Sequence, residues 1–477
     1  MRSDRMSAAD RWPAQIKFIV GNEACERFSF YGMKSILAGY IAGEVARGGL
    51  GQDVDTATSI IHTFVFAVYF MPLFGAWLSD RVIGRYHTIL YVSLFYCAGH
   101  GVLACSDMLT TVNAKLLCLY TGLSLIAFGS GGIKPCVSAF VGDQFKPEQS
   151  HLLQKAYGAF YWSINFGSFF SFLVVPWVKD HHGYGLAFGV PGILMGMATF
   201  IFWLGTKHYI RVPPTRETKT ASFMKVFWHA LTSGDRKPGQ SFWDAARGRF
   251  SEREVDAAKS IGPILSIFLL IPPFWALFDQ TNSTWVLQGQ KMVSFRLFGL
   301  EVGAEQMQSA NPALVMILVP LLTLVIYPML GRYATPLRRM SFGLFLTASS
   351  YLIVAELQRQ IEAGARLGVA WQALPYLVLT TAEVLVSTTG LEFAFTQAAP
   401  ELKSTIMSFW LLTVAFGDLL VVAITKFLPG SGARAHSASV STSRFLLYAA
   451  LTFVVAILFS IVASRYRYRG EAAIRSN

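Results

Sequence analysis

Charged residues are scarce in this sequence, and long apolar runs are abundant. Only 14% of its 477 residues are Asp, Glu, Lys or Arg, and 53% are apolar. An ordinary soluble domain carries roughly 25% charged residues. The apolar residues gather in repeated runs of about 18 to 28 residues, the length that crosses a hydrocarbon core of about 30 Å as a helix. The composition excludes an ordinary soluble protein and predicts an all-α integral membrane protein.

Three further signals are missing from the sequence. Alternation of apolar and polar residues is absent from the runs, which argues against a membrane β-barrel. The first run contains Glu23, Glu26 and Arg27 and has no small-residue cleavage site, so it is interpreted as a retained helix and not a signal peptide. CxxC and zinc-like spacings are also absent. We therefore interpret the five cysteines, Cys25, Cys97, Cys105, Cys118 and Cys136, as packing residues.

Twelve apolar runs are long enough to be membrane spans. They lie near residues 14–45, 56–79, 86–106, 115–141, 152–178, 186–205, 261–288, 308–330, 338–357, 371–398, 404–427 and 442–464. This order predicts two six-helix bundles, residues 1–205 and 261–477, joined by a polar linker at 206–260. Within the linker, Ala221 to Leu231 has apolar residues at helical spacing, which predicts an amphipathic helix along the membrane surface.

The basic residues are distributed unequally between the two sides of such a protein. The termini and the loops on their side carry about 26 of the 40 Lys and Arg residues, the opposite loops about 10, and the spans four. Cytoplasmic loops are enriched in Lys and Arg, so both termini are predicted to be cytoplasmic. Topology therefore explains the formal charge of +12 without a nucleic-acid partner.

A six-plus-six layout resembles that of the major facilitator superfamily, in which substrate binds between the halves. The loop from Gly75 to Arg85, GAWLSDRVIGR, also resembles a loop motif of that superfamily. Its charged residues, Asp80, Arg81 and Arg85, have two interpretations that the sequence leaves open. They are either solvated loop charges or part of a gating network.

The first span is dense with ionisable residues. A charged side chain at the bilayer centre costs at least about 2.5–3.5 kcal/mol, so such residues are functional candidates. At 100° per residue the polar and aromatic side chains fall within an arc of about 140°. They are Glu23, Glu26, Arg27, Phe30, Tyr31 and Lys34. The alternative is that these charges only neutralise one another, but buried ion pairs roughly break even against apolar residues, which favours a face that looks into a cavity.

Isolated polar residues in other spans complete this set. Lys134, Asp279 and Glu383 each place one charge in a separate span, and Asn165 and Asn311 supply amide donors and acceptors. Cations at Arg27 and Lys134 opposite a carboxylate at Glu383 suit a zwitterion such as a short peptide. A purely anionic substrate would leave Glu383 unexplained.

His62 lies seven residues before Tyr69 in the second span, so both side chains project to nearly the same face. A membrane histidine is either a satisfied packing residue or a proton carrier, because its imidazole titrates near neutrality. Aromatic side chains beside the charged positions are candidates for side-chain pockets. They are Phe30, Tyr31, Tyr69, Trp275 and Trp410.

Several separated motifs resemble those of the proton-dependent oligopeptide transporter family. Glu23 to Gly32, EACERFSFYG, is similar to its ExxERFxYYG signature, with Phe30 in place of the first tyrosine. Gly131 to Pro135 with Asp143 to Phe145 resembles its fourth-span signature, and Phe160 to Gly167 resembles its FYxxINxG signature. The resemblance covers nearly the whole chain except the linker and termini.

The resemblance implies roles for individual positions. It implies proton coupling at Glu23, Glu26 and His62, and we predict the same role for Asp279. It implies peptide contacts at Arg27, Lys134, Asn165, Asn311 and Glu383. We predict further peptide contacts at Tyr31, Lys34, Tyr69, Trp275 and Trp410. The resemblance also implies an outer gate formed by Lys34 with Asp279 and an inner gate formed by Lys134 with Glu383. The loss of a hydroxyl at Phe30 removes one polar contact to peptide.

The predicted function is proton-coupled symport of di- and tripeptides by alternating access. The expected protein is a compact twelve-helix, monomeric carrier of a bacterial inner membrane, driven by protons without a cofactor or metal. Carriage of another charged solute, such as nitrate or a plant-type metabolite, is the main alternative. A peptide sensor also stays open, whereas the lack of HExxH, GxSxG or a nucleophile and base at useful spacing argues against an enzyme.

Overall fold

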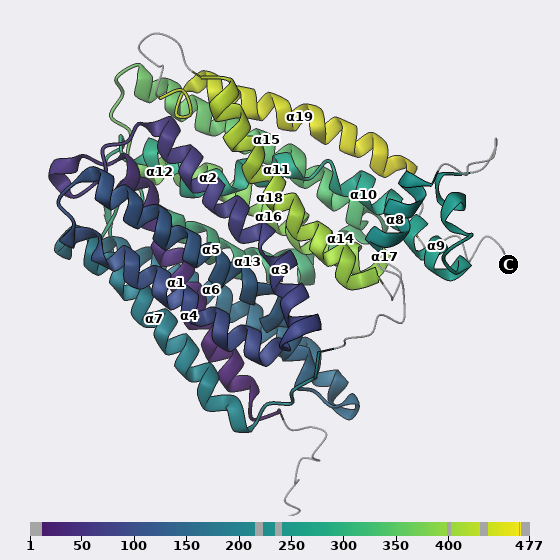
Figure 1. The fold of residues 1–477 in the computed structure, drawn as a ribbon. Helices are drawn as coiled ribbons and strands as arrows, with labels where there is room; N and C mark the ends of the chain where they lie inside the picture. The colour runs from purple at the N-terminus through teal and green to yellow at the C-terminus, as the bar shows by residue number, and fades with distance from the viewer. Residues whose placement is uncertain are drawn as a thin grey trace, which may run out of the picture.

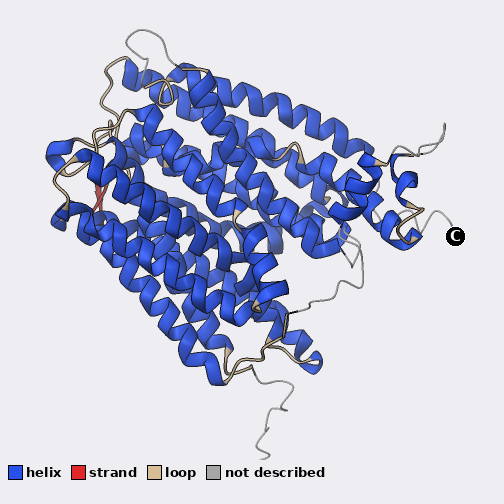
Figure 2. Ribbon diagram, in the orientation of Figure 1, coloured by secondary structure: helices blue, strands red, loops and turns tan. Residues whose placement is uncertain are grey.

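The computed structural model describes residues 12–214, 223–233, 241–397, 402–429, 437–466 and 468. Helices make up almost all of this part of the chain (Figure 2). The two short strands, β1 (Phe295–Leu297) and β2 (Leu300–Val302), form an antiparallel hairpin in which Arg296 pairs with Glu301. The predicted all-α fold is confirmed. Most of the predicted cytoplasmic termini lie outside the described residues.

Each predicted span of the first half is a helix. They are α1 (Ile16–Ala42), α2 (Val54–Phe70) continued by α3 (Pro72–Trp77), α4 (Arg85–Ala104), α5 (Val112–Asp143), α6 (Ser150–His182) and α7 (Tyr184–Leu204). Among the described residues, ten helices are long and apolar enough to cross a membrane, and a bent helix pair makes eleven. Helix α1 is not one of them because of its charges. Its 27 residues span about 40 Å, so α1 supplies the twelfth span.

The spans of the second half are more often interrupted. Their helices are α10 (Ile261–Phe268), α11 (Pro272–Phe278), α12 (Thr284–Gly289), α13 (Ala310–Leu321), α14 (Tyr327–Leu330), α15 (Pro336–Glu362), α16 (Ala373–Glu383), α17 (Thr389–Gln397), α18 (Lys403–Phe427) and α19 (Thr442–Arg465). Single π-helical turns at 322–326 and 384–388 join α13 to α14 and α16 to α17. Such turns are rare and occur frequently at functional sites.

The predicted linker contains helical structure in its described parts. Helix α8 (Phe223–Thr232) lies where the apolar spacing predicts a helix, and it buries Phe223 while Trp228 stays exposed. Helix α9 (Glu252–Lys259) begins with a capping box between Ser251 and Glu254. The helix that leads into the seventh span therefore starts earlier than residue 261. The proposed bounds of the two bundles stay a prediction.

Helices α1–α7 and helices α10–α19 form two groups that lie side by side in Figure 1. The groups meet most extensively where α2 packs against α18 and where α6 packs against α13. Their axes converge at the end that carries β1 and β2, here called the hairpin end. They diverge toward the end that carries α8 and α9, here called the linker end (Figure 1). The two groups are thus in closest contact at the hairpin end.

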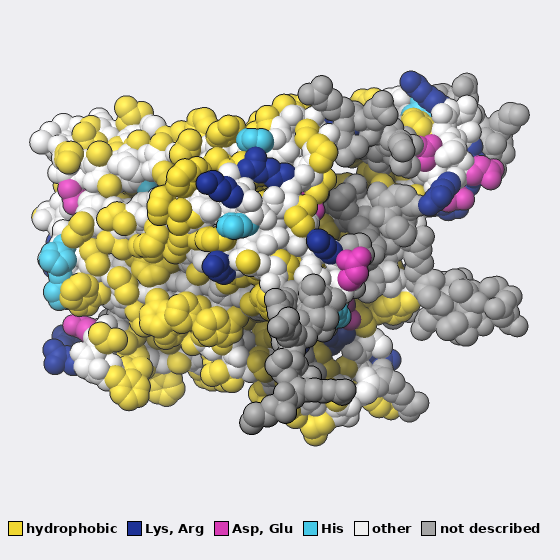
Figure 3. Space-filling model, turned by 90° about the horizontal axis from the view of Figure 1, so that it is seen from below, with side chains coloured by type: hydrophobic (Ala, Val, Ile, Leu, Met, Phe, Trp, Pro, Cys, Tyr) yellow, Lys and Arg dark blue, Asp and Glu magenta, His cyan; other side chains and the backbone are white. Residues whose placement is uncertain are grey.

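Hydrophobic side chains cover much of the face shown in Figure 3. Large apolar side chains such as Trp203, Leu324 and Phe453 are more than half exposed, as expected of a surface in contact with lipid. Lys and Arg side chains gather in one part of this face and at its edges, and Asp and Glu are fewer there (Figure 3). This surface fits the predicted membrane protein.

Glycines allow helices α3 and α5 to approach closely. A Cβ added at Gly75 would lie against the carbonyl oxygen of Gly132 and 2.7 Å from its Cα. A Cβ at Gly131 would lie 2.8 Å from the carbonyl oxygen of Val68. Backbone atoms cannot rotate away, so small residues are required here. This contact fixes the part of α5 that carries Lys134.

We expect Gly75→Ala to destabilise the protein by about 1–3 kcal/mol, because α3 and α5 must separate to accept the methyl group. Gly196→Ala is the matched control. Gly196 is also within a helix, but apart from its chain neighbours and the backbone of its own helix, no heavy atom lies within 4 Å of its added Cβ. That variant should be neutral or gain up to about 1 kcal/mol. Thermal unfolding of the purified protein in detergent compares the two, and equal melting temperatures would contradict the close contact.

Candidate functional site

A buried triad of charges lies on α1. The Nε of Arg27 is 2.6 Å from an oxygen of Glu23 and 3.1 Å from an oxygen of Glu26. Both glutamates are 2% exposed, and the arginine side chain is 13% exposed. One cation therefore faces two carboxylates in a site that is almost closed to water, where electrostatic interactions are strong.

Close packing against α6 fixes this part of α1. A Cβ added at Gly167 would touch the carbonyl oxygen of Ala24 and lie 3.1 Å from the amide nitrogen of Phe28. A Cβ at Gly32 would lie 2.7 Å from a methyl group of Val175. The glycine of the FYxxINxG-like segment thus lets α6 touch the backbone of the ExxER-like segment. Two motifs that are far apart in sequence form one helix contact.

Lys134 lies between two aromatic rings and forms no ion pair with the residues that the structure describes. Its Nζ is 4.3 Å from the ring centre of Phe30 and 4.4 Å from that of Tyr69, and it has no hydrogen-bond partner among the described residues. Attraction to two ring faces partly compensates its charge. Glu383 instead accepts a 2.6 Å hydrogen bond from the amide of Asn311. Lys134 and Glu383 therefore do not meet in this arrangement, in which the two helix groups that carry them separate toward the linker end, and their role as an inner gate stays a prediction.

The predicted contact of Lys34 with Asp279 is present. The Lys34 Nζ donates to the Asp279 carboxylate at 3.0 Å, and both side chains are nearly buried. Asp279 begins a 3-10 turn, η8 (Asp279–Asn282), and the backbone of Ser283 then leaves helical geometry before α12 begins. Interrupted helices of this kind expose backbone groups at the binding sites of transporters. The ion pair joins α1 to this break.

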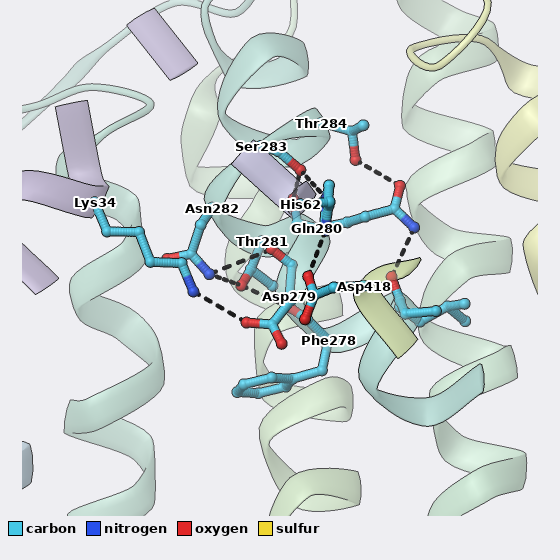
Figure 4. Close-up of polar contacts among 12 residues, drawn as sticks. Lys34, His62, Phe278, Asp279, Gln280, Thr281, Asn282, Ser283, Thr284 and Asp418 are labelled. Carbon is cyan, nitrogen blue, oxygen red and sulfur yellow. Dashed lines mark hydrogen bonds and ion pairs between the residues drawn. The ribbon is translucent and has the colours of Figure 1, made fainter. Parts of the chain in front are cut away.

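His62 joins α2 to two elements of the other helix group. Its Nδ1 is 2.6 Å from a carboxylate oxygen of Asp418 on α18, and its Nε2 is 2.8 Å from the hydroxyl of Ser283 (Figure 4). The side chains of His62 and Asp418 have no solvent exposure. If His62 were only a packing residue, its imidazole would not need a buried carboxylate 2.6 Å away. The contact therefore favours a proton-carrying role for His62.

A third ion pair bridges the groups at the hairpin end. Lys179 on α6 lies 2.5 Å from Glu305, which precedes α13, and 3.0 Å from Asp180. Nearby, the amide of Gln308 donates to the backbone carbonyl of Ser35 at 3.1 Å. Several polar contacts thus close the hairpin end.

A cavity of about 160 Å³ lies between the two helix groups. Eight of the predicted site residues line it: Tyr31, Lys34, Tyr69, Asn165, Trp275, Asp279, Asn311 and Glu383. They come from α1, α2 and α6 on one side and from α11, η8, α13 and α16 on the other. Carboxylates, an ammonium group, amides and phenols face one small space. Such a wall can hold a small molecule that carries both charges and hydrogen-bonding groups.

The other predicted residues do not line this cavity. Trp410 is 2% exposed, and its ring packs 6.3 Å from that of Trp275 and 5.3 Å from that of Phe268. It therefore supports the cavity wall from behind in this structure. Glu23, Glu26, Arg27, Lys134 and His62 also lie outside the lining. Their roles stay predictions.

Three functional candidates were missed in the sequence. Asp418 is an isolated acid within the eleventh apolar run, the same signal that points to Asp279, so it could have been found. Lys179 and Glu305 lie at the ends of apolar runs, where charges are common. Only the packing of α6 against the segment before α13 brings them together.

Comparisons with known proteins agree with this architecture. Residues 86–437 match the family model described as the POT family. Peptide transporter family 1 of Drosophila melanogaster is 39% identical over 74% of this chain and 49% of its own length. Solute carrier family 15 member 2 of Rattus norvegicus is 38% identical over 74% of this chain and 50% of its own. The chain thus spans about half the length of the curated relatives it matches.

Solved structures match over almost the whole chain. An auto-inhibited POT family peptide transporter has a TM-score of 0.86 and 38% identity, and the match covers 95% of this chain and 98% of the other. The POT family transporter PepTSo has the same TM-score and identity over 96% and 99%. The arrangement of helices described above is therefore that of known transporters.

Proposed function

Because this chain belongs to the POT family, we propose that it carries di- and tripeptides across a membrane by proton-coupled symport. Similar proteins are named peptide transporters, and one 38% identical structure is described as a proton dependent oligopeptide family transporter. The observation that carries the proposal is the cavity between the two helix groups, with Lys34, Asp279 and Glu383 on its wall. A peptide offers a carboxylate, an amine and amide groups to such a wall.

The charges suggest how a peptide is oriented. Glu383 and its partner Asn311 suit the amine end, with Asn165 on the opposite wall. Lys134 has no hydrogen-bond partner among the described residues and so suits the carboxylate end, together with Arg27. As the helix groups close at the linker end, a bound zwitterion would connect the two sides. The peptide would then bind more tightly when the linker end is closed than when it is open. Such a difference in affinity is what shifts a protein from one conformation to the other.

Protons are proposed as the driving force. Glu23, Glu26, His62 and Asp279 are the groups that we propose to couple proton binding to conformation. With Lys and Arg enriched on the linker side, the linker end and both termini face the cytoplasm. In this orientation the structure is closed to the outside and opens toward the cytoplasm. We propose that the protein acts in a bacterial inner membrane as a monomer, without a cofactor and without catalysing a reaction.

Uptake of radiolabelled dialanine into proteoliposomes with an imposed pH gradient tests the function. We expect accumulation that a protonophore abolishes and that unlabelled alanyl dipeptides, but not nitrate, inhibit. Accumulation that persists with the protonophore would overturn proton coupling. Competition by nitrate would favour another charged solute. Peptide binding without uptake into sealed vesicles would favour a sensor.

Replacing Glu383 should lower the affinity of the protein for dialanine. Glu383→Gln keeps the shape but removes the charge that holds the peptide amine, and a hydrogen bond to a charged group is worth about 1.5–3 kcal/mol. The dialanine concentration for half-maximal competition should therefore rise about 10- to 150-fold. Ser387→Ala, on the same cavity wall, is the uncharged control and should change it little. Equal affinities for Glu383→Gln and the parent protein would remove Glu383 from the peptide site.

A further inference from the structure

A groove of about 620 Å³, here called the lateral groove, lies between α2, α5 and the end of α18. Helix α2 packs against both of the other helices (Figure 1). Thr63, Ser124 and Lys426 on the groove walls are exposed, and no lining residue of the groove also lines the central cavity. The groove therefore faces the outer surface of the bundle. Ligand pockets commonly have volumes of about 300–1,000 Å³, so it is large enough for a ligand.

The polarity of the lateral groove falls from the hairpin end inward. Asp55, Ser59, Thr63 and Ala67 follow one another along α2 at four-residue intervals, which places them on one face of the helix. A carboxylate is thus followed by two hydroxyls and then by a methyl group, over about 18 Å. One leaflet of a bilayer, with its headgroups, is about 20 Å thick. The groove has the length of one lipid and the same order of polar and apolar parts.

The middle and deep parts of the groove suit the ester groups and acyl chains of a lipid. Phe64 and Leu123 contribute apolar surface to the walls. Three hydroxyls also lie on the walls, those of Ser59, Thr63 and Ser124, and no hydrogen bond joins them to any described residue. A free hydroxyl can donate to an ester oxygen. A surface that contacted only acyl chains would not need these hydroxyls.

Charges of both signs lie at the hairpin end of the groove. Lys426 is an exposed cation in the last turn of α18. Asp53 and Asp55 lie at the start of α2 and are partly exposed. Asp53 accepts the backbone N–H of Thr56 and Asp55 that of Ser439, both at 2.8 Å, but each carboxylate keeps lone pairs for a further donor. A phosphate suits the lysine, and an ammonium group suits the two acids.

We propose that the lateral groove binds one phospholipid with an ethanolamine headgroup, taken from the leaflet at the hairpin end. Its phosphate lies at Lys426, its ammonium group lies at Asp53 and Asp55, and an acyl chain follows the face of α2. An anionic headgroup would place its net charge beside two carboxylates and one lysine, which is unfavourable. A choline headgroup has no N–H to donate to the carboxylates. Because α2 and α18 belong to different helix groups, the bound lipid contacts both.

Photo-crosslinking tests this site without measuring transport. The full chain is placed in nanodiscs of choline lipid that contain a small fraction of an ethanolamine lipid with a diazirine on its acyl chain. After irradiation, mass spectrometry compares the label on residues 59–67 and 120–127 with the label on residues 446–458 of α19, which include exposed apolar side chains outside the groove. We expect the label to be concentrated on the first two segments. Equal labelling of all three would overturn the proposal.

Competition identifies the headgroup. Replacing part of the choline lipid by unlabelled ethanolamine lipid should remove most of the label from the groove, whereas the same amount of phosphatidylglycerol should remove little. Equal displacement by the two lipids would overturn the proposed headgroup. Asp53→Asn should reduce this difference, because it removes one carboxylate while Asn still caps α2. An unchanged difference in this variant would remove Asp53 from the headgroup site.

Lys426→Gln should lower the labelling of the groove about tenfold, since it removes a charged donor to the phosphate. Lys115→Gln is the matched control. Lys115 lies near the start of α5, at the same end of the bundle, but does not line the groove, so its loss should leave the labelling unchanged. Equal labelling in Lys426→Gln and the parent protein, or an equal loss in both variants, would overturn the role of Lys426. Failure of dialanine uptake in the parent protein would refute the proposed function and leave these measurements intact.

Discussion

Replacing Asp279 by asparagine should abolish proton-driven accumulation of dialanine and preserve exchange of dialanine in the absence of a gradient. The variant loses one of the two carboxylates that face Lys34 in the closed hairpin end. Asp279 is one of the groups proposed to couple proton binding to conformation, and an amide in its place cannot take up a proton. The hairpin end can still open and close, but neither step is then linked to a proton at this position, so the gradient has nothing to act on.

The expected effect is large. With one proton carried per neutral peptide, a gradient of one pH unit can concentrate dialanine about tenfold, since tenfold corresponds to about 1.4 kcal/mol. In Asp279→Asn the internal and external concentrations should become equal. Counterflow, in which unlabelled dialanine inside the vesicle drives labelled dialanine inward, should continue within about threefold of the parental rate. Retained accumulation by this variant would remove Asp279 from the coupling mechanism.

Glu305→Gln is the matched control for this experiment. Glu305 also pairs with a lysine across the two helix groups, but its partner Lys179 keeps a second acid, Asp180, at 3.0 Å. Neither Glu305 nor Lys179 lines the central cavity. This variant should still accumulate dialanine, even if the hairpin end closes less tightly. Loss of accumulation in both variants would mean that closure itself, and not its protonation, is disrupted.

The spans and the polar face of α1 could be predicted from the sequence because both depend on local patterns. Apolar length sets the position of a span, and the spacing of Glu23, Arg27 and Lys34 sets one helical face. The contact of Lys34 with Asp279 came from the family resemblance. Nothing local indicates it, because 245 residues separate the two.

Breaks within the helices were not predictable in the same way. The π turn at 384–388 begins with Val-Leu-Val, so hydropathy shows no interruption there. The 3-10 turn at 279–282 is polar, but it lies inside the stretch predicted as one span, 261–288. Asp418 could be recognised as a buried charge, but its partner could not, because only the packing of α2 against α18 brings His62 to it. The sequence thus indicates which charged residues are unusual for a membrane span. It does not indicate which of these residues contact one another.

The predicted inner gate of Lys134 with Glu383 is not closed in this structure, for a related reason. A transporter has at least two arrangements of its halves, and one sequence encodes both. In the arrangement described here, Lys34 meets Asp279 at the closed hairpin end, whereas Lys134 lies against aromatic rings and Glu383 accepts a hydrogen bond from Asn311. A resemblance that implies both gates cannot say which one is closed in a given structure.

Arg27→Gln should be the most destabilising of the substitutions considered. Arg27 is the cation between Glu23 and Glu26, at 2.6 and 3.1 Å, and both acids are 2% exposed. Removing one partner of a buried ion pair costs about 3–5 kcal/mol, because the remaining charge stays buried without compensation. At pH 8 the variant should therefore melt at a clearly lower temperature than the parent protein, and dialanine uptake should be lost.

Two further measurements separate the loss of charge balance from a general packing defect. Lowering the pH to 5 should restore part of the stability of Arg27→Gln, because protonation neutralises a carboxylate that has lost its cation. The triple variant Glu23→Gln, Glu26→Gln, Arg27→Gln should recover most of the melting temperature at pH 8, since no charge is then left in the site. It should still not transport, because Arg27 is also proposed to hold the peptide carboxylate. If the triple variant melts at as low a temperature as Arg27→Gln, the loss of stability comes from the lost packing of the arginine side chain and not from the loss of its charge.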